Sequence, residues 1–444
     1  MNSINRDIIR LSLPTIVSNI TVPLLGICDT AISGHLGSEL FLSAIAVGSV
    51  MLNVVFWIFG FLRGGTTGLT ANAFGGGNRK EISKVLFRSL TIAFIAGFLL
   101  IIFQIPLCKG LMAIAGAGEE IRRDVEIYFS IRIWGSPALL ATMVISGWFV
   151  GMQTTFYPML IAIIMNVINI ITSYSLAFPF NYGFSGVALG TLVSNWFGLL
   201  IAAGFLAWFG RGKIIRLSFR ELMHGRWIRY FSVNGNLFLR SFFIICVTMG
   251  VTAAGARLGN LTLAVNVIVM QFFQFFSFFM DGFAFSGEAI VGLRTGEKNF
   301  SMLRKSVNLL LLWALGTGIV FSMIYYFGTE SIASLLTDNT AVVEGVTELL
   351  PWIVLIPLIS CWAFIYDGFY VGLTDTFRMM ISALIGGILF FFIIWINQNN
   401  YFSSSQINGN IVIWTAFLTY LLARGVYLAI VWPQALNRKF VRKI

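Results

Sequence analysis

The stretch FFQFFSFFMDGFAFSGEAIVG, residues 272–292, decides the fold class, because it is almost entirely apolar and yet contains two carboxylates. It belongs to a longer apolar run, 261–291, and about 20 such residues in a helix cross a ~30 Å hydrocarbon layer. We therefore expect Asp281 and Glu288 to lie inside a membrane-spanning segment. An ionisable group in hydrocarbon costs roughly 2.5 kcal/mol or more, so such residues usually face a protein interior or a water-filled cavity. They are candidates for function.

The composition of the chain excludes a soluble fold. Of its 444 residues, 58% are hydrophobic and 11% are charged, whereas soluble domains carry about 25% charged residues. Backbone polar groups in lipid must be satisfied within the segment, and continuous apolar runs favour helices over a closed barrel. We expect an all-α polytopic membrane protein with twelve spans, at 8–32, 40–72, 85–107, 125–150, 155–178, 184–209, 227–255, 261–291, 303–327, 345–371, 377–397 and 409–433. The first run lacks a clear cleavage site, so we expect it to be retained as a span.

The basic residues alternate with the spans in a way that predicts the orientation of the chain. One side of the membrane receives 21 of the 29 Lys and Arg residues, at 6–10, 79–88, 211–229, 294–305, 378 and 438–443. The opposite side receives Lys109, Arg122, Arg123 and Arg257. The positive-inside rule then places both termini in the cytoplasm, and we expect the membrane to be a bacterial plasma (inner) membrane. A nucleic-acid-binding face would not alternate loop by loop with the spans, so the net charge of +11 does not indicate nucleic acid.

The chain repeats itself at an offset of 221 residues. Residues 146–156, SGWFVGMQTTF, align with residues 367–377, DGFYVGLTDTF. The same offset aligns Gly75, Asn78 and Lys84 with Gly296, Asn299 and Lys305, and an offset of 222 aligns Leu36-Gly37 with Leu258-Gly259. Three matches at nearly one offset indicate a duplication. We expect two six-helix bundles, 1–210 and 230–444, joined by a cytoplasmic linker of 211–229. They should be related by a pseudo-two-fold axis along the membrane normal, with a cleft between them.

The first span combines two prolines with a carboxylate. Pro14 and Pro23 each remove a backbone hydrogen bond, which lets the helix kink, and Asp29 follows near the end of the span. One interpretation places Asp29 at the helix end, where it reaches the outer interface, because Gly34 and His35 follow soon after. The other makes Asp29 a titratable or cation-binding carboxylate beside a bendable helix.

Polar side chains share a face on the fifth and sixth spans. Asn166 and Asn169 lie three residues apart, and Asn169 and Ser173 lie four apart, so one helix face can present all three. Thr191 and Asn195 repeat the spacing of four on the sixth span. Hydrogen bonding between helices, worth about 0.6 kcal/mol per pair, and a functional site explain this pattern equally well.

The C-terminal half has an ionisable set of its own. Arg240 lies within the seventh span, Asp281 and Glu288 within the eighth, and Asp367 within the tenth. A buried arginine needs acidic partners, so Arg240 is expected to pair with Asp281 or Asp367. Glu288 has a second interpretation, at the cytoplasmic end of its span. The positions 221 residues before these three carboxylates carry no Asp or Glu. The two halves are therefore similar scaffolds with different ionisable groups.

These residues, in this order across twelve spans, resemble the DinF-type branch of the multidrug and toxic compound extrusion (MATE) transporters. The resemblance covers essentially the whole chain and rests on Pro14 with Asp29, Asn166-x-x-Asn169-Ile170, Arg240, the segment from Met280 to Gly292, and the segment from Asp367 to Thr376. It implies two six-helix bundles that alternately expose a central cleft. It also implies antiport of organic, often cationic or amphipathic, compounds against protons or sodium. We expect no enzyme activity, no cofactor and a monomer.

The family's site residues transfer to this chain one by one. The resemblance assigns cation coupling to Asp29, Asn169 and Thr191, and it puts Ser173 where the family has an aspartate. The N-terminal bundle then offers one carboxylate among neutral oxygens, and a lone buried carboxylate binds a proton readily. We therefore expect a proton as the coupling ion, with a weak sodium site at Asp29 as the alternative and no other metal.

Two other functions fit parts of this pattern. A flippase for lipid-linked precursors would share the duplicated bundles, but it would prefer a strongly cationic cleft. An intramembrane transferase would need clustered His, Asp or Arg at a membrane face, and the loops are poor in these residues. The exporter is the leading hypothesis, and the Phe- and Met-rich segment 270–280 would suit greasy cationic substrates if it lined the cleft rather than packing in the core or against lipid.

Overall fold

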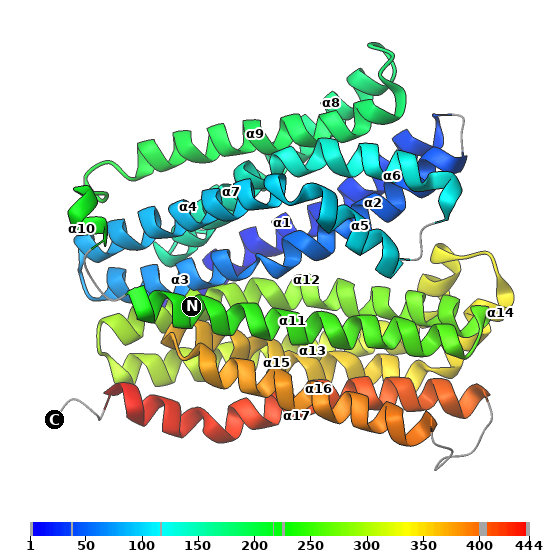
Figure 1. Ribbon diagram of the computed structural model, residues 1–444. Coiled ribbons are helices and arrows are strands. Elements are labelled where there is room, and N and C mark those ends of the chain that lie inside the picture. The colour runs from blue at the N-terminus through cyan, green and yellow to red at the C-terminus, as the bar shows by residue number, and fades with distance from the viewer. Residues whose placement is uncertain are drawn as a thin grey trace. The chain divides into compact units, whose positions relative to one another are not determined.

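Apolar helices form nearly all of the computed structural model, which describes residues 3–36, 39–115, 118–215, 217–223, 227–398 and 406–440 (Figure 1). Within these ranges there are twelve helical segments long and apolar enough to cross a membrane, and there is no β-strand. The predicted all-α class and the predicted number of spans are therefore confirmed. Gly37 of the repeat, and Arg216, Arg226, Arg442 and Lys443 of the basic segments, lie outside the described residues.

The chain forms two compact units. The N-terminal unit consists of Leu13–Trp227, and the C-terminal unit consists of Ile228–Ile444 together with Met1–Ser12. The predicted domains, 1–210 and 230–444 with a linker of 211–229, stay a prediction. The units differ from them mainly because the first turns of the first span are grouped with the C-terminal part of the chain.

The first half of the chain contains ten α-helices and one 3₁₀ helix in its described residues. They are α1 (Ser3–Gly34), α2 (Glu39–Ile58), α3 (Phe61–Gly75), α4 (Arg79–Ile102), α5 (Gln104–Ala115), α6 (Glu119–Arg132), η1 (Ile133–Gly135), α7 (Ser136–Gly151), α8 (Phe156–Ala177), α9 (Gly183–Phe209) and α10 (Phe219–Met223). The second predicted span is one segment interrupted between α2 and α3, and the fourth is interrupted by η1. Helix α4 begins before its predicted start because the Asn78 side chain accepts a hydrogen bond from the Glu81 N–H at 3.0 Å and caps the helix.

The second half contains seven described helices. They are α11 (Trp227–Arg257), α12 (Asn260–Gly296), α13 (Phe300–Leu336), α14 (Thr340–Glu348), α15 (Leu350–Leu373), α16 (Thr376–Gln398) and α17 (Gln406–Phe440). Several extend beyond the predicted spans, and the predicted span 345–371 contains the end of a separate short helix, α14. Hydropathy finds the apolar centre of a helix, whereas capping residues such as Asn299, which accepts from the Met302 N–H at 3.1 Å, decide its ends.

The duplication is visible in the backbone. Asn78 and Asn299, which are 221 residues apart, cap α4 and α13 with nearly the same dihedral angles, φ −91° and −95°. Gln153 and Thr374, also 221 apart, both adopt left-handed conformations, with φ of 64° and 56°, just after α7 and α15. Such conformations are uncommon for residues other than glycine. Their recurrence at the predicted offset supports the duplication.

Close helix approach also recurs at this offset. A Cβ atom on Gly147 of α7 would collide with the carbonyl oxygen of Arg63 on α3, and a Cβ on Gly368 of α15 would collide with that of Ala284 on α12. One turn later, Cβ atoms on Gly151 and Gly372 would each lie 2.9 Å from a carbonyl oxygen of the facing helix. Small residues at these positions let the backbones of membrane helices touch.

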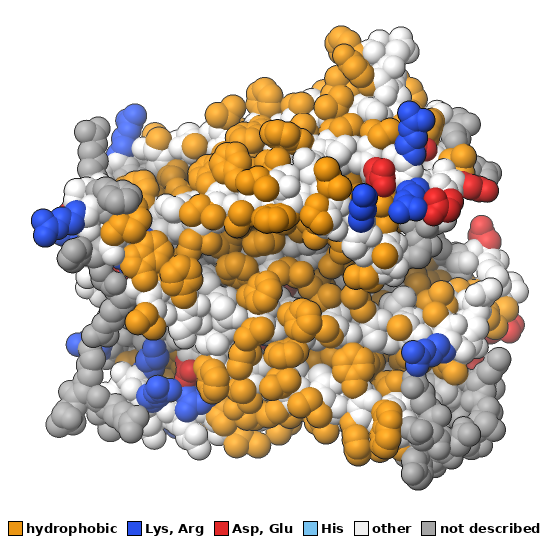
Figure 2. All heavy atoms as spheres, in the orientation of Figure 1, with side chains coloured by type: hydrophobic (Ala, Val, Ile, Leu, Met, Phe, Trp, Pro, Cys, Tyr) orange, Lys and Arg blue, Asp and Glu red, His pale blue; other side chains and the backbone are white. Residues whose placement is uncertain are grey.

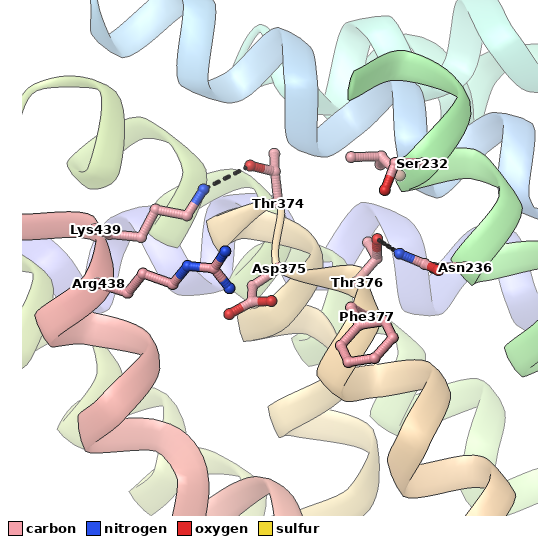
Figure 3. Close-up of a pocket in the computed structure, with 9 residues that line it drawn as sticks. Ser232, Asn236, Thr374, Asp375, Thr376, Phe377, Arg438 and Lys439 are labelled. Carbon is pink, nitrogen blue, oxygen red and sulfur yellow. Dashed lines mark hydrogen bonds between the residues drawn. The ribbon is translucent and has the colours of Figure 1, made fainter. Parts of the chain in front are cut away.

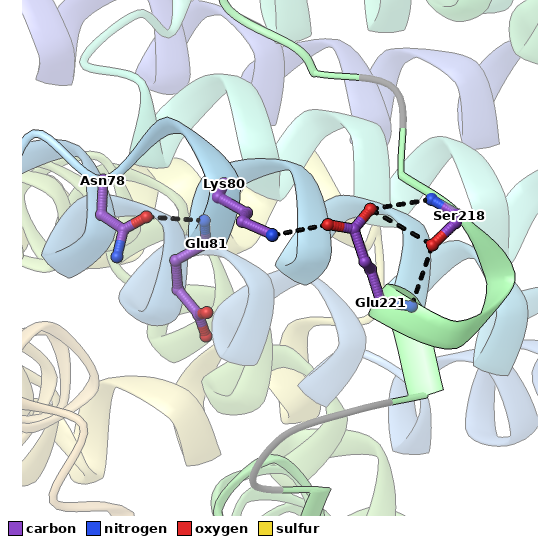
Figure 4. A network of polar contacts seen from close by, with 5 residues as sticks. All are labelled: Asn78, Lys80, Glu81, Ser218 and Glu221. Atoms are coloured by element: carbon purple, nitrogen blue, oxygen red, sulfur yellow. Dashed lines mark hydrogen bonds and ion pairs between the residues drawn. The ribbon is translucent and has the colours of Figure 1, made fainter.

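The predicted linker packs on the N-terminal unit through polar contacts (Figure 4). Glu221 of α10 accepts a hydrogen bond from Lys80 Nζ of α4 at 2.6 Å and another from the Ser218 N–H at 3.0 Å. The Lys80 hydrogen bond, and then the Ser218 backbone hydrogen bond, lower the pKa of Glu221 to about 2. Arg88 of α4, which is buried, donates through Nε and Nη2 to the Leu222 carbonyl at 3.0 and 2.9 Å. These contacts hold α10 against α4.

Hydrophobic side chains cover much of the visible surface, and charged side chains gather toward the helix ends (Figure 2). Exposed apolar residues such as Leu200, Phe327 and Ile388 belong to the spanning segments. In water this surface would be costly, but lipid tails are as apolar as these side chains. The distribution is that of an integral membrane protein.

Gly368→Ala is expected to lower the thermal unfolding midpoint of the purified protein in detergent by several degrees. The added methyl group would press on the Ala284 backbone, and overpacking of this kind costs about 1–3 kcal/mol. Gly147→Ala should have a similar effect in the N-terminal unit. Gly316→Ala on α13 is the control, because nothing lies within 4 Å of its Cβ position. Equal midpoints for Gly368→Ala and Gly316→Ala would contradict the close approach.

Candidate functional site

A buried ion cluster joins three helices of the C-terminal unit. Asp367 of α15 accepts from Arg240 of α11 and from Arg424 of α17, and both guanidinium groups donate to the same oxygen, Oδ2. The Arg424 Nη2–Oδ2 distance is 2.5 Å. The side chains of Asp367 and Arg424 are each 6% exposed, whereas that of Arg240 is 22% exposed. Of the two carboxylates expected near Arg240, it is therefore Asp367 that pairs with it.

The cluster carries an excess positive charge, because two arginines share one carboxylate. Arg424 also donates to the Tyr420 hydroxyl at 2.9 Å. Asp367 Oδ1 and the Nε atoms of both arginines are buried and have no hydrogen-bond partner among the described residues. The charges of Asp367, Arg240 and Arg424 therefore depend on one another. Removal of the carboxylate would leave two buried positive charges without a counter-charge.

Sequence reasoning missed Arg424. It lies inside the predicted span 409–433, and the rule that flagged Arg240 applies equally to it. Glu288 is buried, and Asp281 is half-buried seven residues earlier on α12, which places both on one face of that helix. The prediction that these two residues serve a polar site stays a prediction.

The polar residues of the fifth and sixth predicted spans come together where α8 packs on α9. Asn169 Nδ2 donates to Thr191 Oγ1 at 3.0 Å, and Ser173 Oγ lies 3.5 Å from Asn169 Oδ1. Thr191 Oγ1 and Ser173 Oγ also reach the Val187 carbonyl, at 3.3 and 3.4 Å. All three side chains are buried. Interhelical hydrogen bonding, one of the two interpretations of this pattern, is therefore present.

Helix α1 runs through both prolines without ending and is tied to α8. Asn166 Nδ2 donates to Thr21 Oγ1 at 2.8 Å, two residues before Pro23. Asp29 lies near the end of α1, and its Oδ1 atom is buried without a hydrogen-bond partner among the described residues. Asp29 makes no hydrogen bond to the cluster of Asn169, Ser173 and Thr191 within the part of the chain that the structure describes. The structure thus joins three of the four predicted coupling residues by hydrogen bonds, and in the described residues none of these bonds includes Asp29.

A second arginine that sequence reasoning missed lies in the N-terminal unit. Arg132, at the end of α6, donates through Nη1 to the Tyr128 hydroxyl at 2.9 Å and to Ser49 Oγ at 3.3 Å. Its positive charge acts on Asp29. The sequence suggested that only neutral groups surround Asp29, and Arg132 adds a positive charge to these surroundings. Within the described residues, no three His, Cys, Asp or Glu side chains cluster as metal ligands would.

Asp367→Asn is expected to destabilise the protein more than Arg240→Gln. Neutralising Asp367 leaves two buried arginines without a counter-charge, and breaking a buried pair in this way costs about 3–5 kcal/mol. Neutralising Arg240 leaves Arg424 paired with Asp367. Thermal unfolding midpoints in detergent measure both effects, and the double variant shows whether they couple. An Arg240→Gln variant as unstable as Asp367→Asn would contradict the assigned charge balance.

The comparison with known proteins matches each half of the chain separately to one family model. The MatE family model matches the chain twice, at residues 14–175 and 237–396. DNA damage-inducible protein F of Escherichia coli is 31% identical over an alignment of 449 positions, which covers 98% of this chain and 93% of that protein. A probable multidrug resistance protein NorM of Bacillus cereus is 23% identical over 86% of this chain and 85% of its own length.

The fold is also that of a solved transporter. The crystal structure of the Vibrio cholerae MATE transporter VcmN in the bent form matches with a TM-score of 0.86 at 17% identity, over 99% of this chain and 98% of that chain. The two matches to the family model together span more than half of the chain. The chain therefore belongs to the MatE family, the multidrug and toxic compound extrusion transporters.

Proposed function

We propose that this protein is a cation-coupled antiporter that exports organic, cationic or amphipathic compounds by alternating access of its two bundles. The family membership and the similarity to a probable multidrug resistance protein support export of such compounds. We further propose that it acts as a monomer in a bacterial plasma membrane with both termini in the cytoplasm. The distribution of basic residues among the loops supports this orientation.

The half-buried carboxylate of Asp29 carries the proposal. Its Oδ1 atom has no hydrogen-bond partner among the described residues, although most buried polar atoms in native proteins have one. An unsatisfied carboxylate in a membrane span is costly and marks an ion or substrate pathway. Its helix contains Pro14 and Pro23, where backbone hydrogen bonds are missing. Binding and release of a cation at Asp29 would therefore act on a helix that bends easily.

The coupling ion is proposed to be a proton. The side chains of Asn169, Ser173 and Thr191 hydrogen-bond to one another and to backbone, so their oxygens are already engaged. A sodium ion prefers several oxygen ligands, and the single carboxylate of Asp29 supplies few of them. A proton needs only one lone pair. The arrangement around Asp29 thus favours protonation over sodium coordination.

Asp29→Asn is expected to abolish export driven by an ion gradient, because the amide neither releases a proton nor attracts a cation. Export of a fluorescent organic cation from proteoliposomes measures this loss. Asp338→Asn makes the same chemical change at an exposed position after α13 and should leave export unchanged. Wild-type export by Asp29→Asn would refute the role of this carboxylate.

Export is expected to follow a proton gradient and to ignore a sodium gradient. Proteoliposomes at equal pH on both sides, with sodium on one side, should not export the cation above the level of empty vesicles. The same vesicles with a pH difference and no sodium should export it. Transport that depends on sodium at equal pH would overturn proton coupling and leave the antiporter proposal intact.

Cysteines placed at Arg304 and Asp338 are expected to label from opposite sides of the membrane. Both positions are exposed at opposite ends of α13, and the charge distribution puts Arg304 inside the cell and Asp338 outside. The background is a variant that lacks Cys28, Cys108, Cys246 and Cys361, which are unpaired thiols. A membrane-impermeant maleimide added to whole cells should label position 338 only. Labelling of position 304 alone would reverse the proposed orientation.

A further inference from the structure

A cavity of about 330 Å³ opens in the C-terminal unit where four membrane helices begin or end (Figure 3). Helix α11 contributes Ser232 and Asn236 near its start, and α17 contributes Arg438 and Lys439 near its end. The turn between α15 and α16, residues 374–377, forms the rest of the lining. The cavity thus lies where span ends place the polar headgroup layer of a bilayer.

The lining carries positive charge. Arg438 and Lys439 bring two cations to the cavity, and Arg378 lies next to it. The carboxylate of Asp375 also faces the cavity, but Arg378 Nη1 forms an ion pair with its Oδ2 atom. Three cations against one carboxylate leave a net positive site.

The site also offers hydrogen-bond donors suited to an oxyanion. The Arg438 guanidinium is exposed and makes no hydrogen bond or ion pair with any described residue, so its planar fork remains available. Lys439 Nζ donates to Thr374 Oγ1 at 3.0 Å, which places the ammonium group beside the turn. Asn236 Nδ2 donates to Thr376 Oγ1 at 3.3 Å on the other side. A guanidinium with an adjacent ammonium and hydroxyl groups is a common arrangement for binding phosphate.

Two exposed aromatic rings, those of Phe377 in the lining and of Phe231 beside Ser232 in the sequence, form what we call the apolar rim of the cavity. Phe377, which lines the cavity, is 56% exposed, and Phe231, one residue before Ser232, is 57% exposed. Exposed aromatic rings at a span end fit the interface between headgroups and acyl chains. A ligand with a phosphate group and a hydrocarbon part would satisfy both the cations and the rings.

The duplication shows that the fold itself does not require these charges. Adding 221 to Phe209, the last residue of α9, gives Ile430, yet α17 continues to Phe440. This extension supplies Arg438 and Lys439. The counterparts of these two residues in the first half are Leu217 and Ser218, which are uncharged, although the turn at Gln153 has the same left-handed conformation as that at Thr374. These two cations therefore belong to the second half alone and are not part of what the duplicated halves share.

We propose that this cavity binds a phosphate group, held by Arg438 and Lys439 beside the α15–α16 turn. The phosphate is that of an anionic phospholipid headgroup or inorganic phosphate, and the apolar rim favours the lipid. The lining contains neither Asp29 nor any member of the Asp367 cluster, so the proposal does not depend on the transport mechanism.

The test uses the full-length protein in detergent, with short-chain phosphatidylglycerol, short-chain phosphatidylcholine and inorganic phosphate as probes. Binding is measured by native mass spectrometry and by the shift in thermal unfolding midpoint that a ligand of the native state produces. Phosphatidylglycerol should bind the wild type more tightly than phosphatidylcholine, because the choline group meets the cations unfavourably. The variant Arg438→Gln/Lys439→Gln should weaken phosphatidylglycerol binding about tenfold or more, since it removes both cations that line the cavity.

The matched control is Arg304→Gln/Lys305→Gln. It removes the same charge from exposed positions at the start of α13, which do not line the cavity. This control should leave phosphatidylglycerol binding unchanged. Inorganic phosphate that binds the wild type but not Arg438→Gln/Lys439→Gln, and that competes with the lipid, would support the phosphate site and identify free phosphate as a ligand. Equal loss of lipid binding in both double variants, or no loss in either, would overturn the proposal.

Discussion

The close contact of α15 with α12 through Gly368 is the constraint on which the C-terminal unit depends. No side chain separates the two backbones at this point, because a Cβ on Gly368 would collide with the Ala284 carbonyl. Asp367 precedes this glycine, so the rotation of α15 that permits the contact also fixes the direction of the carboxylate. It is held where Arg240 and Arg424 both reach Oδ2. The turn at Thr374 then follows within two helical turns, so the same contact also positions the lining of the basic cavity.

The N-terminal unit repeats this contact with different chemistry. Gly147 touches Arg63 as Gly368 touches Ala284, but the residue before Gly147 is Ser146, where the other half has Asp367. Gly60, the counterpart of Asp281, lies in the interruption between α2 and α3, whereas α12 is continuous at Asp281. The glycine contacts between helices are shared between the halves, and the carboxylates of Asp281 and Asp367 are not. The duplicated scaffold therefore tolerates a change of charge at positions that do not contribute to the helix contacts.

Sequence patterns predicted the parts of this protein that depend on local physics. Hydropathy identified twelve spans because each must match the same hydrocarbon thickness, and matched residues 221 apart identified the duplication. The cluster around Asp367 was harder to predict from the sequence, because the two arginines that contact Asp367 lie 127 and 57 residues away from it along the chain. Span order alone left Asp281 and Asp367 as equal partners for Arg240. Only the rotation of each helix, which is set by tertiary packing, distinguishes between them and brings in Arg424.

The two units differ in how freely their carboxylates, Asp367 and Asp29, can bind a cation. A cation that approached Asp367 would meet two guanidinium groups already bound to that carboxylate, and like charges in a low dielectric repel strongly. Asp29 forms no ion pair with any residue that the structure describes, and Arg132 hydrogen-bonds to Tyr128 and Ser49 instead. Asp29 is therefore the better placed of these two carboxylates to gain and lose a cation. Ser173 fits the proposed proton coupling, because it is fully buried against Gly190 and hydrogen-bonded to Asn169, so a larger carboxylate side chain would have little space at this position.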